Sequence, residues 1–296
     1  MRSEEQMLNL IVETARADAR IRAAFLQGSR TNPNAPRDIF QDFDVIYVVD
    51  ETRPFREDRR WIDRFGKRLY MQYPEENPDE PSDVENCYGW LMQLADGNRL
   101  DLHVCTWKGA LSEIARDGAF RVLLDKDGCL PQKNRETDEA FRVRPFTAAQ
   151  FACAVNEFWW CTNNVAKGLW RGELPYVMDM LNLHARPMLT RLLAWKVGLD
   201  TRFLVSPGKS GKYLGRFLPE EAWRAYLATY AAAKERALWQ AVFTMCDLVE
   251  ATAEEIAERT GYPYDAGEAR AARGHLAHVR ALPKDAPAVY GEAGRS

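Results

Sequence analysis

Two aspartates in the first third of the chain have the spacing of a divalent-metal site. Asp42 and Asp44 flank Phe43 and precede the apolar run from Val45 to Val49, which is typical of a buried β-strand. Side chains of a strand alternate between its two faces, so both carboxylates should lie on one face. Two carboxylates that close repel each other unless a cation joins them. The pattern therefore indicates a cation site at the start of this strand.

A glycine turn and a third carboxylate occur in the context that such a site requires. Residues 23–27 are predicted to form a short strand that runs into Gly28 and Ser29, where bare backbone amides can approach phosphate oxygens. Asp101 lies between two leucines on the second arm of a hairpin predicted for 88–104. An Asp-x-Asp alone is common. Three acids at strand positions beside a Gly turn are the apparatus of metal-assisted nucleotidyl transfer.

These residues, in this order, resemble the DNA polymerase β-like nucleotidyltransferase superfamily. The stretch GSRTNPNAPRDIFQDFDVIYVV is similar to the aminoglycoside 6-adenylyltransferases, also called streptomycin adenylyltransferases. The likeness continues through RLDLHV, LLDKDG, FWWCTNNVAKGLWRGELPY and GKSGKYLGRFL. It implies an α+β protein. Its N-terminal nucleotidyltransferase domain would hold a mixed β-sheet flanked by helices, and a C-terminal helical bundle would follow.

The resemblance also implies roles for the three acids. Asp42 and Asp44 would bind Mg²⁺, a hard ion that uses one or two carboxylates together with substrate phosphates and water. Two ions are expected, one on the β and γ phosphates of ATP and one at the α-phosphate and the attacking hydroxyl. Asp101 would either ligate the second ion or accept the hydroxyl proton as general base, and we favour the base.

Four more polar residues lie near these acids in the sequence. Ser29 is expected to hydrogen-bond a terminal phosphate, and Arg30 is a candidate charge partner or one member of a surface salt bridge. Asp38 lies in the intervening loop and could cap a turn. His103 shares the strand face of Asp101 and is expected to be a packing residue more than a ligand.

The second half of the chain must supply cations, because three aspartates and one arginine cannot balance a triphosphate. Lys167 and Arg171 are four residues apart on a predicted helix, and Lys209 and Lys212 lie in the Gly-rich turn SPGKSGKY, which is not a P-loop. Aromatic neighbours suggest that the helical pair is partly buried, where an unpaired cation is costly. The alternative for that pair is a solvated helix face.

Acidic residues are the candidates for contact with a cationic acceptor. Glu173 and Asp179 are expected to hold cationic groups of an aminoglycoside. Residues 74–85 carry three prolines and six acids without one Lys or Arg, which predicts an acidic loop. That loop is either a solvated linker or a negative lip that attracts a polycation.

Composition defines the broad class of protein. The 296 residues are 46% hydrophobic, enough for two domains, which we place at 1–135 and 136–296. A net charge of −3 argues against a non-specific nucleic-acid binder. Six cysteines without a C-x-x-C pair and four histidines argue against zinc. With no signal-peptide pattern or membrane span, we expect a reduced, cytoplasmic, soluble protein, and its oligomeric state is not predicted.

The hydrophobic pattern predicts the elements that position the candidate residues. A short strand is expected at 121–125. Helices are expected at 4–19, 58–73, 151–170, 176–197, 219–233 and 238–256.

Together these features predict an enzyme that transfers AMP from ATP to a hydroxyl of an aminoglycoside and releases pyrophosphate. The resemblance implies a streptomycin-like acceptor and its 6-position, hence antibiotic modification. Two alternatives stay open: a transferase that acts on a protein or RNA end, and a catalytically silent nucleotide-binding module. The lack of a basic surface disfavours RNA, and the presence of all three acids disfavours the silent module.

Overall fold

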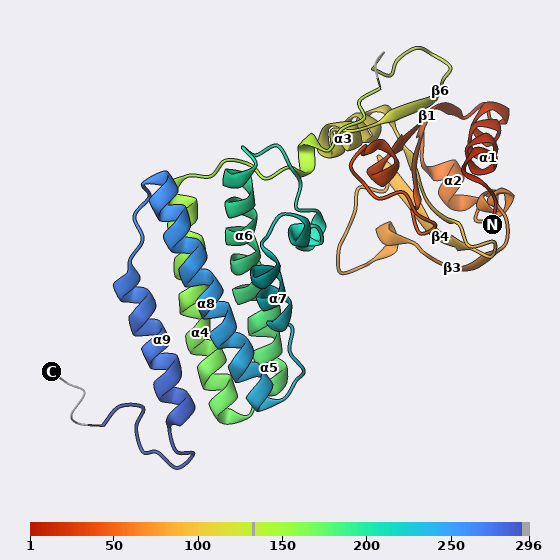
Figure 1. Cartoon of the computed structure of the whole chain (residues 1–296). Coiled ribbons are helices and arrows are strands. Elements are labelled where there is room, and N and C mark those ends of the chain that lie inside the picture. Colours follow the sequence, from red (N-terminus) through yellow and green to blue (C-terminus); the bar gives the residue numbers. More distant parts are fainter. Residues whose placement is uncertain (132–133, 292–296) are drawn as a thin grey trace. The chain divides into compact units, whose positions relative to one another are not determined.

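The chain forms two compact units, Met1–Ala140 and Phe141–Ser296 (Figure 1). The computed structural model describes residues 1–131 and 134–291. The units divide between Ala140 and Phe141, whereas the boundary expected from the sequence was at 135/136.

A six-stranded mixed sheet forms the centre of the first unit. Its strands follow the order β3-β4-β5-β2-β1-β6, in which β2 and β5 are parallel and all other neighbours are antiparallel. The predicted mixed sheet and hairpin are confirmed. The strand bounds are β1 (Ile21–Gln27), β2 (Phe43–Val49), β3 (Arg68–Gln72), β4 (Cys87–Leu94), β5 (Arg99–Cys105) and β6 (Arg121–Asp125).

Helices cover both faces of this sheet. Helix α1 (Glu4–Ala17) begins at a capping box made by Ser3 and Gln6, and its Met7 and Ile11 pack on one face. Helix α3 (Trp107–Asp117) buries Ala110 against the other face. Figure 1 shows these two helices on opposite sides of the strands. The short helix α2 (Arg53–Glu57) follows β2.

The helix predicted for 58–73 is wrong. Only a 3₁₀ turn forms, at Trp61–Phe65, and Gly66 then adopts a φ of 114°, which ends the turn. The chain continues as strand β3, where Leu69 is 63% exposed instead of covering the sheet. The helix-like spacing of Trp61, Phe65 and Leu69 therefore comes from a 3₁₀ turn that is followed by a strand, and not from a continuous helix.

The acidic loop at 74–85 is anchored to the sheet at its start. Glu75 accepts a hydrogen bond from the Gly89 amide at 2.9 Å, and Glu76 accepts one from the Tyr88 hydroxyl at 2.6 Å. Apart from a 3₁₀ turn at Pro74–Glu76, the loop has no helix or strand, as predicted. Its first residues are therefore held in place and not a free linker.

Two cysteines pair across the β4–β5 hairpin. Cys87 and Cys105 are directly opposite in the strand register and form a disulfide, while the other four cysteines are free. The expectation of a wholly reduced chain is therefore not met, because the hairpin register brings together residues that have no motif spacing. No helix within 1–131 or 134–291 is long and apolar enough to cross a membrane.

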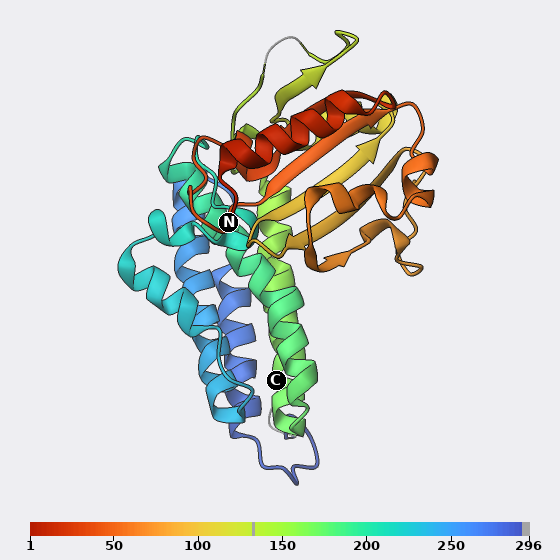
Figure 2. The ribbon, with the colours of Figure 1, turned by 90° about the vertical axis from the view of Figure 1, so that its right-hand side faces the viewer.

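The second unit is a helical bundle, as predicted. Figures 1 and 2 show α4, α8 and α9 side by side along most of their length. A single turn of π-helix, Met180–Ala185, joins α5 to α6, and α9 was not singled out in the sequence. The helices are α4 (Ala148–Arg171), α5 (Leu174–Asp179), α6 (Arg186–Asp200), α7 (Glu220–Ala228), α8 (Glu235–Thr260) and α9 (Ala266–Ala281).

Candidate active site

The three predicted carboxylates meet at one end of the sheet. The parallel pairing of β2 with β5 places Asp44 directly beside Asp101, and Asp42 immediately precedes β2. One ligand oxygen from each of the three side chains lies within 4.8 Å of the others. Sequence alternation placed Asp42 and Asp44 on one face. The strand register adds Asp101 to them.

Gly28 must be a glycine for this cluster to form. Its φ is 68°, and a Cβ atom there would lie 2.1 Å from Oδ2 of Asp44. Its amide donates a hydrogen bond to Asp117 at the end of α3, 3.1 Å away. The turn therefore brings bare backbone against the Asp44 carboxylate, a contact that the sequence did not predict. The expected approach of its amides to phosphate oxygens stays a prediction.

The electrostatics of the cluster favour a bound cation. Burial, together with the charges of Asp42 and Asp101, raises the pKa of Asp44 to about 7. Asp101 is 7% exposed, so water screens it poorly. Three clustered carboxylates are the oxygen donors that Mg²⁺ prefers, and a divalent ion would remove their mutual repulsion. The donor set fits this ion.

Arg99 lies in the cluster and was missed in the sequence. Its guanidinium donates to both oxygens of Asp101, at 2.9 and 2.5 Å, and lies 3.8 Å from Asp42. The hydrogen bonds to Asp101 raise the pKa of Arg99. Strand alternation was the available signal, because Arg99 and Asp101 are two residues apart on β5. One arginine facing three acids leaves the cluster short of positive charge.

Ser29 has the properties of a ligand-binding hydroxyl. Its Oγ is buried and has no hydrogen-bond partner among the residues the structure describes. Buried hydroxyls are normally paired, because an unmade hydrogen bond is costly. A phosphate oxygen beside the turn would satisfy it, in line with the expected role.

Arg30 is buried and hydrogen-bonds to backbone carbonyls of the segment that leads to the acidic cluster. It is 6% exposed and donates to the carbonyls of Gln41 at 2.9 Å and Asp42 at 2.8 Å. It also stacks on Phe43 at 3.7 Å and pairs with Glu4 at 3.1 Å. These contacts hold the segment that carries Asp42, so we assign Arg30 that task in preference to a phosphate contact.

Asp38 and His103 lie beside the site without joining the cluster. Asp38 is exposed and accepts a hydrogen bond from the Phe40 amide at 2.8 Å, the turn-capping role considered for it. His103 approaches Glu75 of the acidic loop at 3.6 Å. A Cβ on Gly89 would lie 2.3 Å from the His103 ring, so that glycine makes room for the imidazole.

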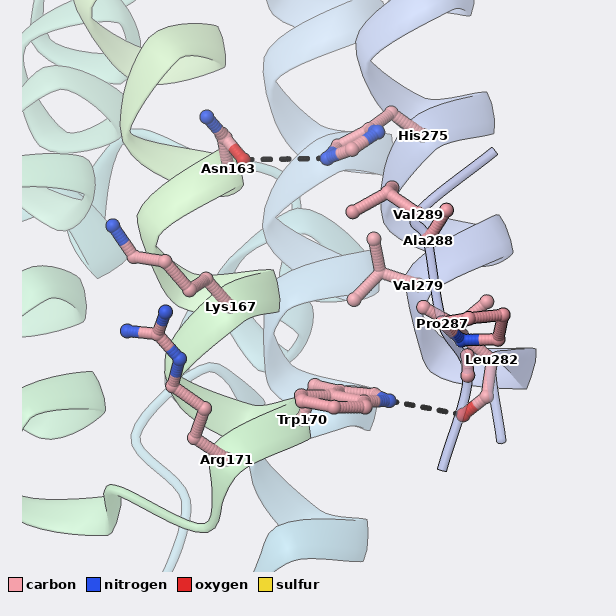
Figure 3. A pocket seen from close by; sticks show the side chains of 11 residues that line it. Asn163, Lys167, Trp170, Arg171, His275, Val279, Leu282, Pro287, Ala288 and Val289 are labelled. Atoms are coloured by element: carbon pink, nitrogen blue, oxygen red, sulfur yellow. Dashed lines mark hydrogen bonds between the residues drawn. The ribbon is translucent and has the colours of Figure 1, made fainter. Parts of the chain in front are cut away.

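The candidate cations of α4 lie in an exposed position. Lys167 and Arg171 are both exposed, so the partial burial expected for them is wrong. Both line a cavity of about 330 Å³, together with Trp170 of the same helix and His275 of α9. Figure 3 shows their charged ends pointing away from the Trp170 ring. Because both side chains are solvated, neither cation needs a bound anion to offset a cost of burial.

Lys209 and Lys212 lie in a different part of the helical unit. Gly208, Ser210 and Gly211 hold positive φ angles of 73°, 56° and 75° in their turn. Both lysines are exposed, and Lys212 lies 5.0 Å from the Tyr213 ring. This turn borders a cavity that Lys167 and Arg171 do not line. The four candidate cations thus form two separate pairs.

Comparison with known proteins decides the family. A family model for streptomycin adenylyltransferase matches residues 1–279. The chain belongs to the streptomycin adenylyltransferase family. It is therefore an enzyme of the nucleotidyltransferase class.

Curated relatives agree with this membership. The chain is 36% identical over 265 residues to an aminoglycoside 6-adenylyltransferase of Bacillus subtilis (strain 168), covering 89% of this chain and 93% of that one. Proteins of the same name from Campylobacter jejuni (33% identity, 89% and 91% covered) and Staphylococcus aureus (30%, 89% and 94%) are also similar. A crystal structure of the B. subtilis enzyme aligns at 29% identity with a TM-score of 0.47, covering 95% of this chain and 100% of that chain.

The two acids predicted to contact the acceptor of this nucleotidyltransferase lie close together in the chain. Glu173 lies between α4 and α5, 3.9 Å from Arg171, and Asp179 ends α5. Both are exposed and therefore accessible to a soluble cation. Their contact with an acceptor stays a prediction.

Proposed function

We propose that this nucleotidyltransferase transfers AMP from ATP to a hydroxyl of an aminoglycoside and releases pyrophosphate. Family membership supports the reaction class, and the names of the relatives support the acceptor and its 6-position. One observation carries the chemistry. Asp42, Asp44 and Asp101 converge within 4.8 Å beside a Gly-Ser turn, with one arginine to offset three acids.

Mg²⁺ is the cofactor that the carboxylate cluster fits. Asp42 and Asp44 would hold it, with Asp101 as a third ligand or as the base. When bound, magnesium supplies charge neutralisation on the phosphates and polarisation of the α-phosphate. The protein itself contributes the unpaired Ser29 hydroxyl for a phosphate oxygen. The buried strands behind the acids hold them in place before the substrate arrives.

Asp101 would accept the proton of the acceptor hydroxyl, the role that we favour for it. Arg99 donates a hydrogen bond to each of the two Asp101 oxygens, and this bidentate contact fixes the orientation of the carboxylate. The base role requires an oxygen to be released from Arg99 towards the hydroxyl. Asp101→Asn distinguishes the two roles, because loss of a base lowers turnover more than ATP affinity, whereas loss of a ligand lowers both.

Cations of the helical unit would meet the triphosphate. Lys209 and Lys212 are favoured over Lys167 and Arg171, because their turn borders a cavity that contains a buried arginine, Arg186. Glu173 and Asp179 would attract the cationic acceptor.

The test is pyrophosphate release from ATP and Mg²⁺ across a panel of aminoglycosides, with mass spectrometry of the products. We expect release only with an acceptor, and a product that is heavier by one AMP unit, with streptomycin among the substrates. Pyrophosphate with a protein or RNA acceptor alone would favour the first alternative. Tight ATP binding without pyrophosphate from any acceptor would favour a silent module.

A further inference from the structure

Arg99 carries the only positive charge that the described residues place in ion-pair contact with the three carboxylates of the acidic cluster. Arg99 and Asp101 share one face of β5, because they are two residues apart on that strand. The side chain of Arg99 is 48% exposed, whereas that of Asp101 is 10% exposed. A solvent-accessible guanidinium therefore reaches over a carboxylate that is nearly buried.

This contact engages both oxygens of Asp101. Nε of Arg99 donates a hydrogen bond to one oxygen at 2.9 Å, and Nη2 donates one to the other oxygen at 2.5 Å. Such a fork matches the flat edge of a carboxylate and is among the stronger ion pairs in proteins. Because the rest of Asp101 is almost covered by protein, little of its carboxylate is left for another ligand.

The other two acids of the cluster are not held in this way. Asp42 approaches Arg99 only at 3.8 Å, which is beyond hydrogen-bond distance. The Asp44 carboxylate accepts no hydrogen bond from any residue in 1–131 or 134–291. One oxygen of each of the three acids nevertheless lies within 4.8 Å of the others. Arg99 thus withholds one member of a set of oxygens that suits a cation.

We propose that Arg99 is a positioning residue that holds Asp101 in the metal-free enzyme and competes with the divalent cation for it. Asp42 and Asp44 would bind the cation first, and Asp101 would join them as a ligand only after Arg99 has turned into solvent. This inference rests on the magnesium site of the proposed function. It adds that binding of the metal displaces a positive charge of the protein itself.

Two properties of Arg99 allow this exchange. Its half-exposed side chain can turn away from Asp101 without opening the core. A divalent cation carries twice the charge of a guanidinium, so the three carboxylates favour the metal once the ion is present. Until then the guanidinium lowers the repulsion among the acids.

The experiment is titration of the full-length protein with Mn²⁺ alone, followed by the electron paramagnetic resonance signal of the free ion. Arg99→Gln should tighten Mn²⁺ binding by roughly tenfold, because the competing fork is lost. Arg99→Lys should tighten it by a smaller factor, because an ammonium keeps the charge but cannot hold both oxygens. Arg22→Gln is the matched control, since Arg22 forms a similar fork with Asp127 outside the acidic cluster. It should bind Mn²⁺ like the wild type.

A double-mutant cycle tests whether the effect of Arg99 passes through Asp101. Asp101→Asn should weaken Mn²⁺ binding by about fivefold more in the Arg99→Gln background than in the wild type, where Arg99 already withholds that carboxylate. A positive charge that acts only through space would give the same factor in both backgrounds. The cycle therefore separates competition for the carboxylate from a general electrostatic effect.

Equal Mn²⁺ affinity of the wild type, Arg99→Gln and Arg99→Lys would overturn the inference, as would additive effects in the cycle. If Arg99→Gln has a lowered melting temperature, the cycle is decided with Arg99→Lys, which retains the charge. Mn²⁺ binding that ignores Arg99, in an enzyme that still transfers AMP, would remove this inference and leave the proposed function intact. No Mn²⁺ binding by the wild type, even with ATP present, would instead remove the metal site on which both rest.

Discussion

The two units of this enzyme leave opposite charges uncompensated. In the first, Asp42, Asp44 and Asp101 face a single arginine. In the second, Arg186 and Arg191 border a cavity without an acid. The acidic cluster suits a divalent cation, and the basic cavity suits an anion.

Two other arginines of the helical unit, by contrast, have acidic partners. Arg259 contacts both Asp200 and Glu255, and Arg273 contacts Asp247 and Glu250. Because unpaired buried charge lowers stability, clusters that keep it mark places where a ligand completes the structure. A missing charge partner therefore identifies these sites more clearly than the residue types do.

The strongest test of the acidic cluster removes one of its charges. Asp42→Asn and Asp44→Asn should each lower transfer by on the order of a thousandfold or more, the scale seen when a residue at the reacting centre is lost. Thermal stability should be equal or higher, because repulsion is relieved. Asp50→Asn, exposed after the far end of β2, is the control. Normal turnover in a folded Asp44→Asn would remove the metal assignment.

The close approach of backbone to Asp44 can be tested separately from the charge. Gly28 and Gly128 have φ angles of 68° and 66°, but only at Gly28 would a Cβ meet the Asp44 carboxylate. We expect Gly128→Ala to cost about 1 kcal/mol of unfolding free energy and Gly28→Ala roughly 2–4 kcal/mol. Denaturant melts measure both. Equal losses would show that Asp44 does not constrain the turn.

The pH dependence of stability should reveal the crowded acid. The pKa of Asp44 rises from 3.8 to about 7 on folding, so ionising it opposes folding. Its contribution to stability should therefore decline as pH rises from about 4 to about 7, and remain constant above that. Mg²⁺ should raise the melting temperature more at pH 8 than at pH 5. The explanation would be contradicted if Mg²⁺ raised the melting temperature of Asp44→Asn by the same amount as that of the wild type, at pH 5 and at pH 8.

The smallest expected effect distinguishes the two pairs of exposed cations. Lys209→Ala should weaken ATP binding several-fold, as expected for loss of one exposed charge contact, while Lys167→Ala should leave it nearly unchanged. Titration with ATP at low and high salt measures both. A larger loss for Lys167→Ala would move the triphosphate to the cavity of α4 and α9.

Local sequence patterns predicted the elements that obey a simple period. Alternation placed Asp42 and Asp44 on one face, and the predicted hairpin gave Asp101 its strand. The helix at 58–73 failed because Gly66 ends a 3₁₀ turn there and β3 follows. The register of β2 with β5 has no local signal. The sequence therefore grouped Asp101 with Asp42 and Asp44 only by its position on a strand and by the family resemblance, and it did not predict that Asp101 pairs with Asp44.

Local sequence patterns could not predict which arginines and lysines are buried and which are exposed. Arg30 is buried because Glu4 and the carbonyl of Gln41 reach it. Arg186 is buried by Thr229, which is 43 residues away in the chain. Lys167 is exposed although aromatic residues adjoin it in sequence. Burial of a long polar side chain depends on tertiary contacts, which composition and spacing do not encode.

The most direct test of the metal assignment is anomalous diffraction from crystals soaked with Mn²⁺ and a non-hydrolysable ATP analogue. We expect a manganese peak about 2.1 Å from carboxylate oxygens of both Asp42 and Asp44, within the range expected for such ligands. Manganese bound only by the phosphates, with all three carboxylates free of metal, would contradict it.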